Sequence, residues 1–493
     1  MRWAGNLAGS TLDLNMKRFF KKYKLTFWDY VAFASCLLFA IAGSLVSVNR
    51  FWQYEVFYYD FGIFDQAIWS VSRFEAPIIE HLVVGGKWIF ADHFNPSIFL
   101  LSPLYWLTDQ QEIILVAQAS IVALSGLVLY LIGKHVLKNK FYAVSILTCY
   151  FLFVGLQNAV ITDFHEVTVA TLPFTLTFLA LIKKKYRLFL LFFIITLGFK
   201  ESNFILGFGI GIALFFLDKS KWKLAIFTCL LSLAWGYLAI QFIIPYFSGG
   251  IYQYVAHMQF NPIQIAATFF DSQTKINTMT NSFLSFGFLP IFSYQFWFLI
   301  FQDFLTRFYS PLWVTRWGLG LHYSALLGAI FGISSIYSLK LLQKIIKKKL
   351  VIDLIAIVLI LNAVYVYHFR LHGPFGLSYN IVFYAHSKDF EFLDKIVELI
   401  PANASVMTQN NLASHFTHQK VMLLRDACNT CKDEHYQMIR PQMDYIVIDS
   451  RPGQNPNNLF PVGKIEKIVK SLERDKNYKA IYKTDFQVVY KKR

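Results

Sequence analysis

Two carboxylates stand close together in an aromatic stretch near the start of the chain. Asp60 and Asp65 lie within residues 58–69, directly after a long apolar run. A charge at membrane depth costs on the order of a few kcal/mol, so an acidic pair beside a membrane span is a functional candidate. Such a carboxylate can act as a general base toward a hydroxyl group. The plainer alternative is a pair of solvated loop residues, and the surrounding aromatic side chains argue against it.

Further polar residues occur at the predicted ends of other apolar runs. Cations and histidines in such places can hold a departing phosphate while a carboxylate accepts a proton. Ordinary interfacial anchoring is the alternative for each residue taken singly, but the joint pattern favours a site. The candidates for binding a donor phosphate or substrate are His93, Lys200, Glu201, Arg307, Arg316, His322 and Tyr323, and a second acidic group contains Asp163, His165 and Glu166.

Composition indicates the class of protein. Of 493 residues, 56% are hydrophobic, 18% aromatic and 15% charged. Soluble chains carry about 25% charged residues, and runs of about 20 apolar residues are typical of membrane helices. The net charge of +16 comes from short basic clusters between apolar runs. This is the positive-inside pattern and not a nucleic-acid-binding surface. We expect a multi-pass protein of the cell membrane, with no nucleic-acid partner.

The basic clusters predict the topology. Lys17–Lys24 precede the first span, so residues 1–29 should be a cytoplasmic N-terminus, with a retained first helix and no cleaved signal peptide. Residues 50–112 then form the first outer loop, and 246–282 a later one. Region 283–306 should hold a hairpin of two short helices. The other spans are expected at about 30–49, 113–133, 141–162, 167–182, 188–199, 203–217, 224–245, 323–340 and 350–367, which gives about eleven in total.

The two short runs 188–199 and 203–217 flank Lys200 and Glu201. Runs of 12 to 15 residues barely cross a hydrocarbon core of about 30 Å, so an out-and-back pair is expected. Lys200 and Glu201 should then lie recessed near the outer surface, where they can pair with each other or with a ligand.

From about residue 370 the chain reads as a small extracytoplasmic α/β domain that extends to residue 493. We predict strands near 405–409, 420–424 and 445–449, a helix at about 463–475 and a strand pair over about 478–490. No glycine-rich nucleotide loop is present in this region.

Five cysteines occur in the chain, and two of them fall in this C-terminal region. Cys36, Cys149 and Cys229 lie in apolar spans and read as small core residues. Cys428 and Cys431 can form a disulfide or remain free thiols. The alternative is a zinc site completed by nearby histidines, and nothing else in the segment resembles a zinc ribbon. Those histidines are His415, His418 and His435.

The polar groups gather at the outer ends of the spans. A transporter would place ionisable groups near the bilayer midplane, in broken helices or repeats. The long spans hold almost no charge, and no convincing repeat is found. Transfer of a sugar from a lipid-linked phosphosugar needs a base and phosphate-binding groups at this depth. A lipid or polysaccharide transporter or flippase remains the second interpretation, and a receptor-like protein the third.

The sequence resembles a prokaryotic membrane family known as domain of unknown function 2079. The resemblance rests on residues 59–69, on His93–Pro96 and Ser102–Tyr105, and on the motifs Asp163–Glu166, Lys200–Glu201 and His322–Tyr323. Near the C-terminus it includes Thr408–Leu412 and Asp444–Asp449.

That family is grouped with the C-type glycosyltransferases. The resemblance implies an all-α multi-helix membrane module, here residues 30–369, and an inverting transfer from a polyprenyl-phosphate sugar to a glycan, lipid or protein acceptor outside the cytoplasm. Asp60 matches the position of the base, although Phe61 stands where many relatives have Glu, which keeps Asp65 as the alternative. In some relatives the second acidic motif helps to hold a divalent metal. A magnesium or manganese ion at Asp163, His165 and Glu166 is therefore an expectation.

Overall fold

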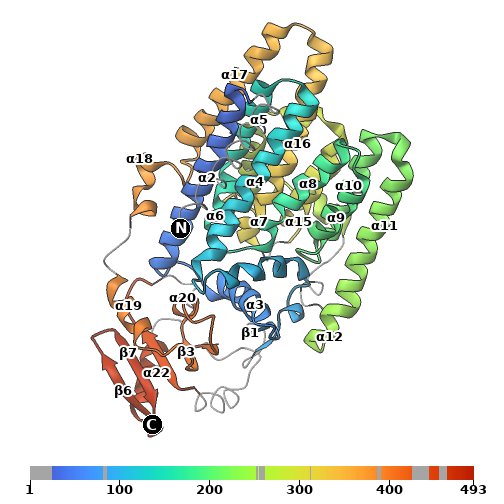
Figure 1. Cartoon of the computed structure of the whole chain (residues 1–493). Coiled ribbons are helices and arrows are strands. Elements are labelled where there is room, and N and C mark those ends of the chain that lie inside the picture. The colour runs from blue at the N-terminus through green and yellow to red at the C-terminus, as the bar shows by residue number, and fades with distance from the viewer. Residues whose placement is uncertain are drawn as a thin grey trace, which may run out of the picture.

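The computed structural model describes residues 25–80, 86–250, 252, 254, 261–310, 313–385, 390–424, 443–454 and 464–493. A helical bundle makes up most of the molecule, and a small β-sheet region lies at one end of it (Figure 1). The predicted basic cluster before residue 25 lies outside the described residues, as do Cys428, Cys431 and His435.

In the described part of the chain, five helical stretches are long and apolar enough to cross a membrane. Two further helices, α5 (Lys140–Phe151) and α6 (Val154–Ile161), are bent by 54° at their junction. They add a sixth crossing if they count as one broken span. The predicted spans at these places are confirmed as apolar helices. The five stretches are α2 (Phe27–Trp52), α4 (Glu112–Leu137), Lys219–Ser248 with α11 (Trp222–Leu238) and α12 (Ile244–Ser248), His322–Ile346 with α16 (Ala325–Ile346), and Lys349–Arg370 with α17 (Lys349–Tyr365).

Shorter apolar helices complete the bundle. They are α7 (Glu166–Val169) followed by α8 (Thr171–Ile182), then α9 (Tyr186–Leu197) and α10 (Asn203–Leu217). The last two are confirmed as apolar helices at the places of the expected out-and-back pair, and their crossing of the membrane stays a prediction. Length and composition thus support at most six crossings among the described residues, and the count of about eleven stays a prediction.

Glycines let α10 approach α11 closely. A Cβ added at Gly207 would clash with Ser232, and one at Gly211 would clash with Cys229. On the facing helix, a Cβ at Gly236 would clash with the ring of Phe204. Small residues at crossings are a common device where lipid replaces water around helices. The turn that carries Lys200 and Glu201 directly precedes α10, so the close packing of α10 on α11 holds this turn in place.

The region before α16 differs from the predicted hairpin. Helix α13 (Pro262–Thr268) and helix α14 (Gln273–Ser285) lie within the stretch expected to be an outer loop, and 3₁₀ turns lead from α14 to α15 (Trp297–Phe308). Periodicity missed α14 because it is largely polar. Its Lys275 is nevertheless buried, paired with Asp271 at 2.8 Å and lying over the ring of Trp317.

A buried carboxylate fixes which helix ends lie together. Asp29, at the start of α2, accepts hydrogen bonds from Lys134 near the end of α4 and from Lys140 at the start of α5. The opposite ends of α2 and α4 and the C-terminal end of α6 therefore gather at the other end of the bundle. That end carries the loop that contains Asp60 and, beyond it, the C-terminal sheet (Figure 1).

The loop between α2 and α4 has structure of its own. A π-helical turn η1 (Tyr58–Gly62) leads into α3 (Ile63–Ser72), and a small hairpin joins β1 (Ile78–Ile79) to β2 (Lys87–Trp88). A long 3₁₀ segment, η3 (Pro96–Trp106), then returns to α4. Buried side chains of this loop form one apolar core with residues of the C-terminal region.

The C-terminal sheet has five strands in the order β4-β3-β5-β7-β6. Strand β3 (Val406–Thr408) is parallel to β4 (Val421–Leu423) and β5 (Tyr445–Asp449). Strand β7 (Gln487–Lys492) is antiparallel to β5 and to β6 (Tyr478–Lys483). The predicted strands and the helix α22 (Lys464–Glu473) are thus confirmed. Helices α19 (Glu391–Glu398) and α20 (Asn410–Ala413) lie between the sheet and the bundle (Figure 1).

Candidate active site

One cavity of about 190 Å³ lies at the end of the bundle that faces the C-terminal sheet. It collects side chains from the α9–α10 turn, from α15 and from the short segments before α16. All seven side chains predicted to bind donor phosphate or substrate line it. They are His93, Lys200, Glu201, Arg307, Arg316, His322 and Tyr323.

Lys200 and Glu201 do not pair with each other in this cavity. Lys200 Nζ lies 2.7 Å from Glu166 Oε1, at the start of α7. Glu201 turns the other way and accepts hydrogen bonds from His93 at 2.9 Å and from the backbone N–H of Phe94 at 3.1 Å. The expected direct pair is therefore replaced by two pairs that join the α9–α10 turn to different elements.

His93 and Glu201 each favour the charged form of the other. Burial alone would lower the pKa of His93, but the facing carboxylate of Glu201 raises it above its ordinary value overall. Burial alone would likewise raise the pKa of Glu201, and His93 is the main reason that it is lowered instead. This ion pair fixes the segment before η3 against the α9–α10 turn.

The long outer loop contributes two tyrosines that sequence reasoning missed. Tyr252 donates to Glu201 Oε1 at 2.6 Å, and Tyr254 donates to Asp92 at 3.1 Å. The ring of Tyr254 also stacks on His93 with centroids 5.0 Å apart. Both lie in the predicted outer loop 246–282, and spacing alone gives no reason to choose these two residues there.

The two arginines of the cavity differ in whether the N–H groups of their guanidinium already have hydrogen-bond partners. Arg307 donates to the carbonyls of Arg316 and Gly318 at 2.8 and 2.7 Å and pairs with Asp303 at 3.3 Å. Arg316 lies over the ring of Trp313, and its buried Nε has no hydrogen-bond partner within the described part of the chain. Arg316 is thus the arginine with donors available to a ligand, while Arg307 mainly holds the backbone around it.

A stacked pair of histidines connects the cavity to Asp60. The ring centroids of His165 and His322 are 3.4 Å apart, and His322 Nδ1 is buried without a partner among the described residues. His165 Nε2 lies 3.4 Å from Asp60 Oδ1, and His165 Nδ1 lies 3.0 Å from the carbonyl of Thr162. The two imidazole rings therefore lie between Asp60 and the cations of the cavity.

Asp60 projects from the π-helical turn η1. Its side chain is 51% exposed, so a substrate hydroxyl can approach it. Gly62 is required in this turn because an added Cβ would clash with the ring of Tyr58. The aromatic stretch seen in the sequence thus shapes the backbone that presents Asp60.

Asp65 is in a different environment. Its carboxylate is fully buried and accepts hydrogen bonds from the hydroxyls of Tyr105 and Thr417. His418 Nε2 lies 3.1 Å from the same carboxylate and stacks on Trp69. With its oxygens engaged inside the protein, Asp65 connects the first loop to the C-terminal region, and the geometry favours Asp60 as the base.

The three residues expected to hold a metal have separate surroundings. Glu166 faces Lys200, while His165 faces Asp60. Asp163 has a φ of 50°, in the left-handed region, and burial raises its pKa to about 7. Across the described ranges no three His, Cys, Asp or Glu side chains are placed to hold one ion. A metal site at these residues stays a prediction.

The histidines considered for zinc are also in separate surroundings. His415 lies between the rings of Phe51 and Tyr54, at 4.2 Å from each, whereas His418 faces Asp65. The expected disulfide between Cys428 and Cys431 falls outside the described residues.

Comparisons with known proteins identify the family and the fold of the chain. A family model described as "Predicted membrane protein (DUF2079)" matches residues 50–489. Among solved structures, ArnT from Cupriavidus metallidurans in the apo state is similar with a TM-score of 0.55, at 10% sequence identity. The similarity covers 94% of this chain and 97% of that one, so the two share a fold over nearly their whole lengths. No curated protein matches the chain by sequence.

Proposed function

Because the chain belongs to the DUF2079 family of predicted membrane proteins and shares its fold with ArnT, a C-type glycosyltransferase, we propose that it is an integral membrane glycosyltransferase of the C type. The donor is a sugar linked to polyprenyl phosphate, and the acceptor is a hydroxyl group at the extracytoplasmic face. Residues 30–369 form the membrane module, with its catalytic first outer loop at 50–112. Residues 1–29 are cytoplasmic, and residues 370–493 form the extracytoplasmic α/β domain.

The observation that carries this proposal is the convergence of the candidate residues on one cavity. Seven side chains from distant segments line a single space beside the helices. Lys200 and Arg316 supply positive charge there, and Arg316 has a buried donor without a partner within the described residues. A phosphate at headgroup level needs such charge-assisted hydrogen bonds, while its lipid tail can follow the apolar helices.

The geometry suggests how transfer proceeds. The acceptor hydroxyl approaches the exposed side of Asp60, which accepts its proton as the oxygen attacks the anomeric carbon of the sugar. The bond between that carbon and the phosphate oxygen breaks, and polyprenyl phosphate leaves with the electron pair. Lys200, Arg316 and His322 stabilise the charge that develops on the phosphate. Attack from the side opposite the leaving group inverts the anomeric configuration.

The direct test is donor consumption by purified protein in detergent. The protein should transfer the sugar to an added acceptor hydroxyl, or more slowly to water, and release polyprenyl phosphate without a gradient or a sealed membrane. Arg316→Gln should raise the donor KM, because it removes the cation with an available buried donor. Arg370→Gln is the matched control, since Arg370 is exposed and donates to Asn281 at 2.8 Å, away from the residues that line the cavity.

The outcome separates the two leading interpretations. A protein that consumes none of a panel of polyprenyl-phosphate sugars in detergent contradicts the enzyme proposal. Movement of a lipid-linked sugar across sealed vesicles by the same preparation would then identify a transporter.

A further inference from the structure

Two motifs near the C-terminus have no role in the transfer described above. The first motif, residues 408–412, begins at the last residue of β3. The second, residues 444–449, consists of β5 and the residue before it. The two strands are neighbours and parallel, so their carboxyl ends meet at one edge of the sheet. In open α/β sheets this is the edge that presents functional side chains. Here the edge faces the loop that carries Asp60.

A side chain from this edge binds the backbone beside Asp60. Asn410 is buried, and its Oδ1 accepts a hydrogen bond from the backbone N–H of Tyr59 at 3.1 Å. Ser414, four residues later, donates its hydroxyl to the carbonyl of Val56 at 2.6 Å. The segment that presents Asp60 is therefore bonded to the C-terminal region at two points, just before the turn and in its first residues.

The N–H of Tyr59 needs an external acceptor because of its place in the turn. The first N–H groups of a helical segment have no partner inside it. In η1 the amides of Asp60, Phe61 and Gly62 all donate to the carbonyl of Phe57. The residue at the N-cap is Phe57, whose side chain cannot accept a hydrogen bond. Asn410 supplies the missing cap from a segment 351 residues away.

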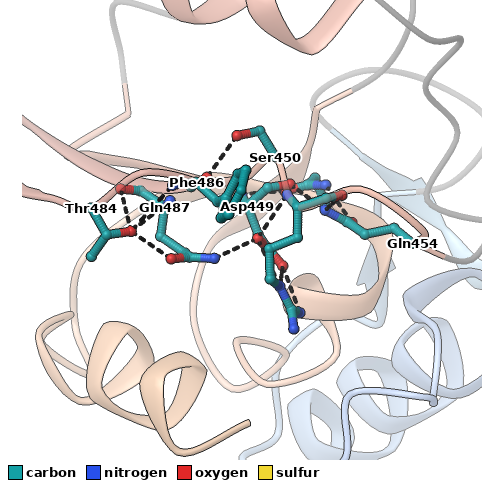
Figure 2. A network of polar contacts seen from close by, with 8 residues as sticks. Asp449, Ser450, Gln454, Thr484, Phe486 and Gln487 are labelled. Carbon is teal, nitrogen blue, oxygen red and sulfur yellow. Dashed lines mark hydrogen bonds and ion pairs between the residues drawn. The ribbon is translucent and has the colours of Figure 1, made fainter. Parts of the chain in front are cut away.

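A buried network holds the residue next to Asn410. Asp449 is fully buried at the end of β5 and accepts hydrogen bonds from Arg451 and Gln487 (Figure 2). Its backbone N–H donates to Gln409 Oε1 at 2.6 Å. The amide of Gln409 donates in turn to Gln454 at 3.1 Å, and Gln454 donates to the carbonyl of Asp449 at 2.6 Å. Both ends of the Gln409 amide are thus fixed.

We propose that Asn410 is a positioning residue for Asp60, held in place by the Asp449 network. This inference rests on the proposed function, since it assigns Asp60 as the base. The C-terminal sheet supports the turn that carries Asp60, and this accounts for Asn410 and Asp449 at the carboxyl ends of β3 and β5. A small displacement of a catalytic group can lower a rate by about 100-fold, so loss of this cap should be seen mainly in kcat.

The test compares Asn410 variants with a control in the same sheet. Asn410→Leu removes the acceptor at similar volume, and Asn410→Asp retains it. Ser405→Ala is the control, because Ser405 exchanges hydrogen bonds with Asp444 at the amino ends of β3 and β5, at the opposite edge. We expect Asn410→Leu to lower kcat by about 10- to 100-fold with the donor KM unchanged. Asn410→Asp should restore most of the rate, and Ser405→Ala should keep it.

Hydrogen exchange gives a readout that does not depend on activity. Amide exchange in a peptide covering residues 57–62 should be faster in Asn410→Leu than in the native protein, and unchanged in Ser405→Ala. If Asn410→Leu does not fold, Asn410→Ala replaces it in both measurements.

The results distinguish this inference from the proposed function. An unchanged kcat in Asn410→Leu, or an equal loss in Ser405→Ala, overturns the positioning role. Unchanged exchange at residues 57–62 overturns it as well. If the native protein consumes no donor but exchange responds as expected, the cap stands and the proposed function fails.

Discussion

His165 stacks on His322 with ring centroids 3.4 Å apart, and this contact joins two halves of the candidate site. On one side His165 faces Asp60, which projects from the first loop. On the other side His322 lines the cavity that contains Lys200 and Arg316. The proposed base and the cations of the cavity therefore lie on opposite sides of this pair of imidazole rings.

Asp60 and Asp65 should respond differently to the same substitution. Asp60→Asn removes an exposed base, so turnover should fall by about 10²–10⁴-fold while the protein stays folded. Asp65→Asn alters a buried acceptor of two hydroxyls and His418, which should lower the melting temperature. Asp109→Asn is a control in the same loop, because Asp109 is 68% exposed and pairs with Arg73. Near-normal turnover in Asp60→Asn, with the loss in Asp65→Asn, would assign the base to Asp65.

Lys200 should affect donor binding separately from stability. Lys200→Ala leaves Glu166 buried and unpaired, so this variant should lose stability. The double variant Lys200→Ala/Glu166→Gln removes both charges and should regain stability. Both variants should raise the apparent donor KM by about tenfold, as expected for a lost charge-assisted hydrogen bond. Lys200→Arg should rescue only in part. A folded double variant with unchanged donor kinetics would exclude this role.

His415 should make the stability of the protein depend on pH. Burial between Phe51 and Tyr54 lowers the pKa of His415 from 6.5 to about 3. Between these values the unfolded chain binds a proton that the folded protein does not, so stability should fall as the pH drops from 6.5 toward 3. His415→Phe keeps a stacked ring without the titration. The melting temperature of His415→Phe should decline less than that of the native protein between pH 6.5 and 3. An equal decline in the two proteins would contradict this role of His415.

Labelling from outside the cell tests the proposed sidedness. In a variant without the five native cysteines, single cysteines can replace the exposed residues Phe74, Lys479 and Lys348. An impermeant thiol reagent should label Phe74→Cys and Lys479→Cys in intact cells, because the first loop and the C-terminal region are packed together. Lys348→Cys should be labelled only after the membrane is opened. Labelling of Lys479→Cys only from the cytoplasm would reverse the topology.

The members of the cavity were predictable because each lies at the outer end of an apolar run or in the loop beside it. When helices cross a membrane repeatedly, their ends must lie at one of its two surfaces. The basic clusters indicate which ends lie at the same surface. This is why His93, Lys200, Arg316 and His322 could be grouped before their contacts were known. Strands β3, β4 and β5 were predictable because each is a short apolar run bounded by turn residues, whereas the pair β6 and β7 was predictable from alternating apolar and polar residues.

The partners within the site could not be predicted from sequence. Lys200 and Glu201 are adjacent in the chain, but the turn between α9 and α10 sends their side chains to different elements, Glu166 and His93. The burial of Asp65 depends on Thr417, a contact that spans 352 residues. The buried face of helix α14 is polar, with Lys275, Thr278, Ser282 and Ser285, so its sequence does not mark it as a buried helix. Contacts such as that of Lys275 with the ring of Trp317 hold it in place.

The bond between Asp65 and Thr417 has a consequence for how the protein is made. On the proposed topology, the first loop is exported early in synthesis, whereas Thr417 and His418 are exported after the last helix has been inserted. Until then the Asp65 carboxylate lacks two of its three partners, and the turn that carries Asp60 lacks its cap from Asn410. Until its final segment is exported, the nascent chain would therefore lack the contacts that hold the proposed base, Asp60, in position. The protein would become active only after that export.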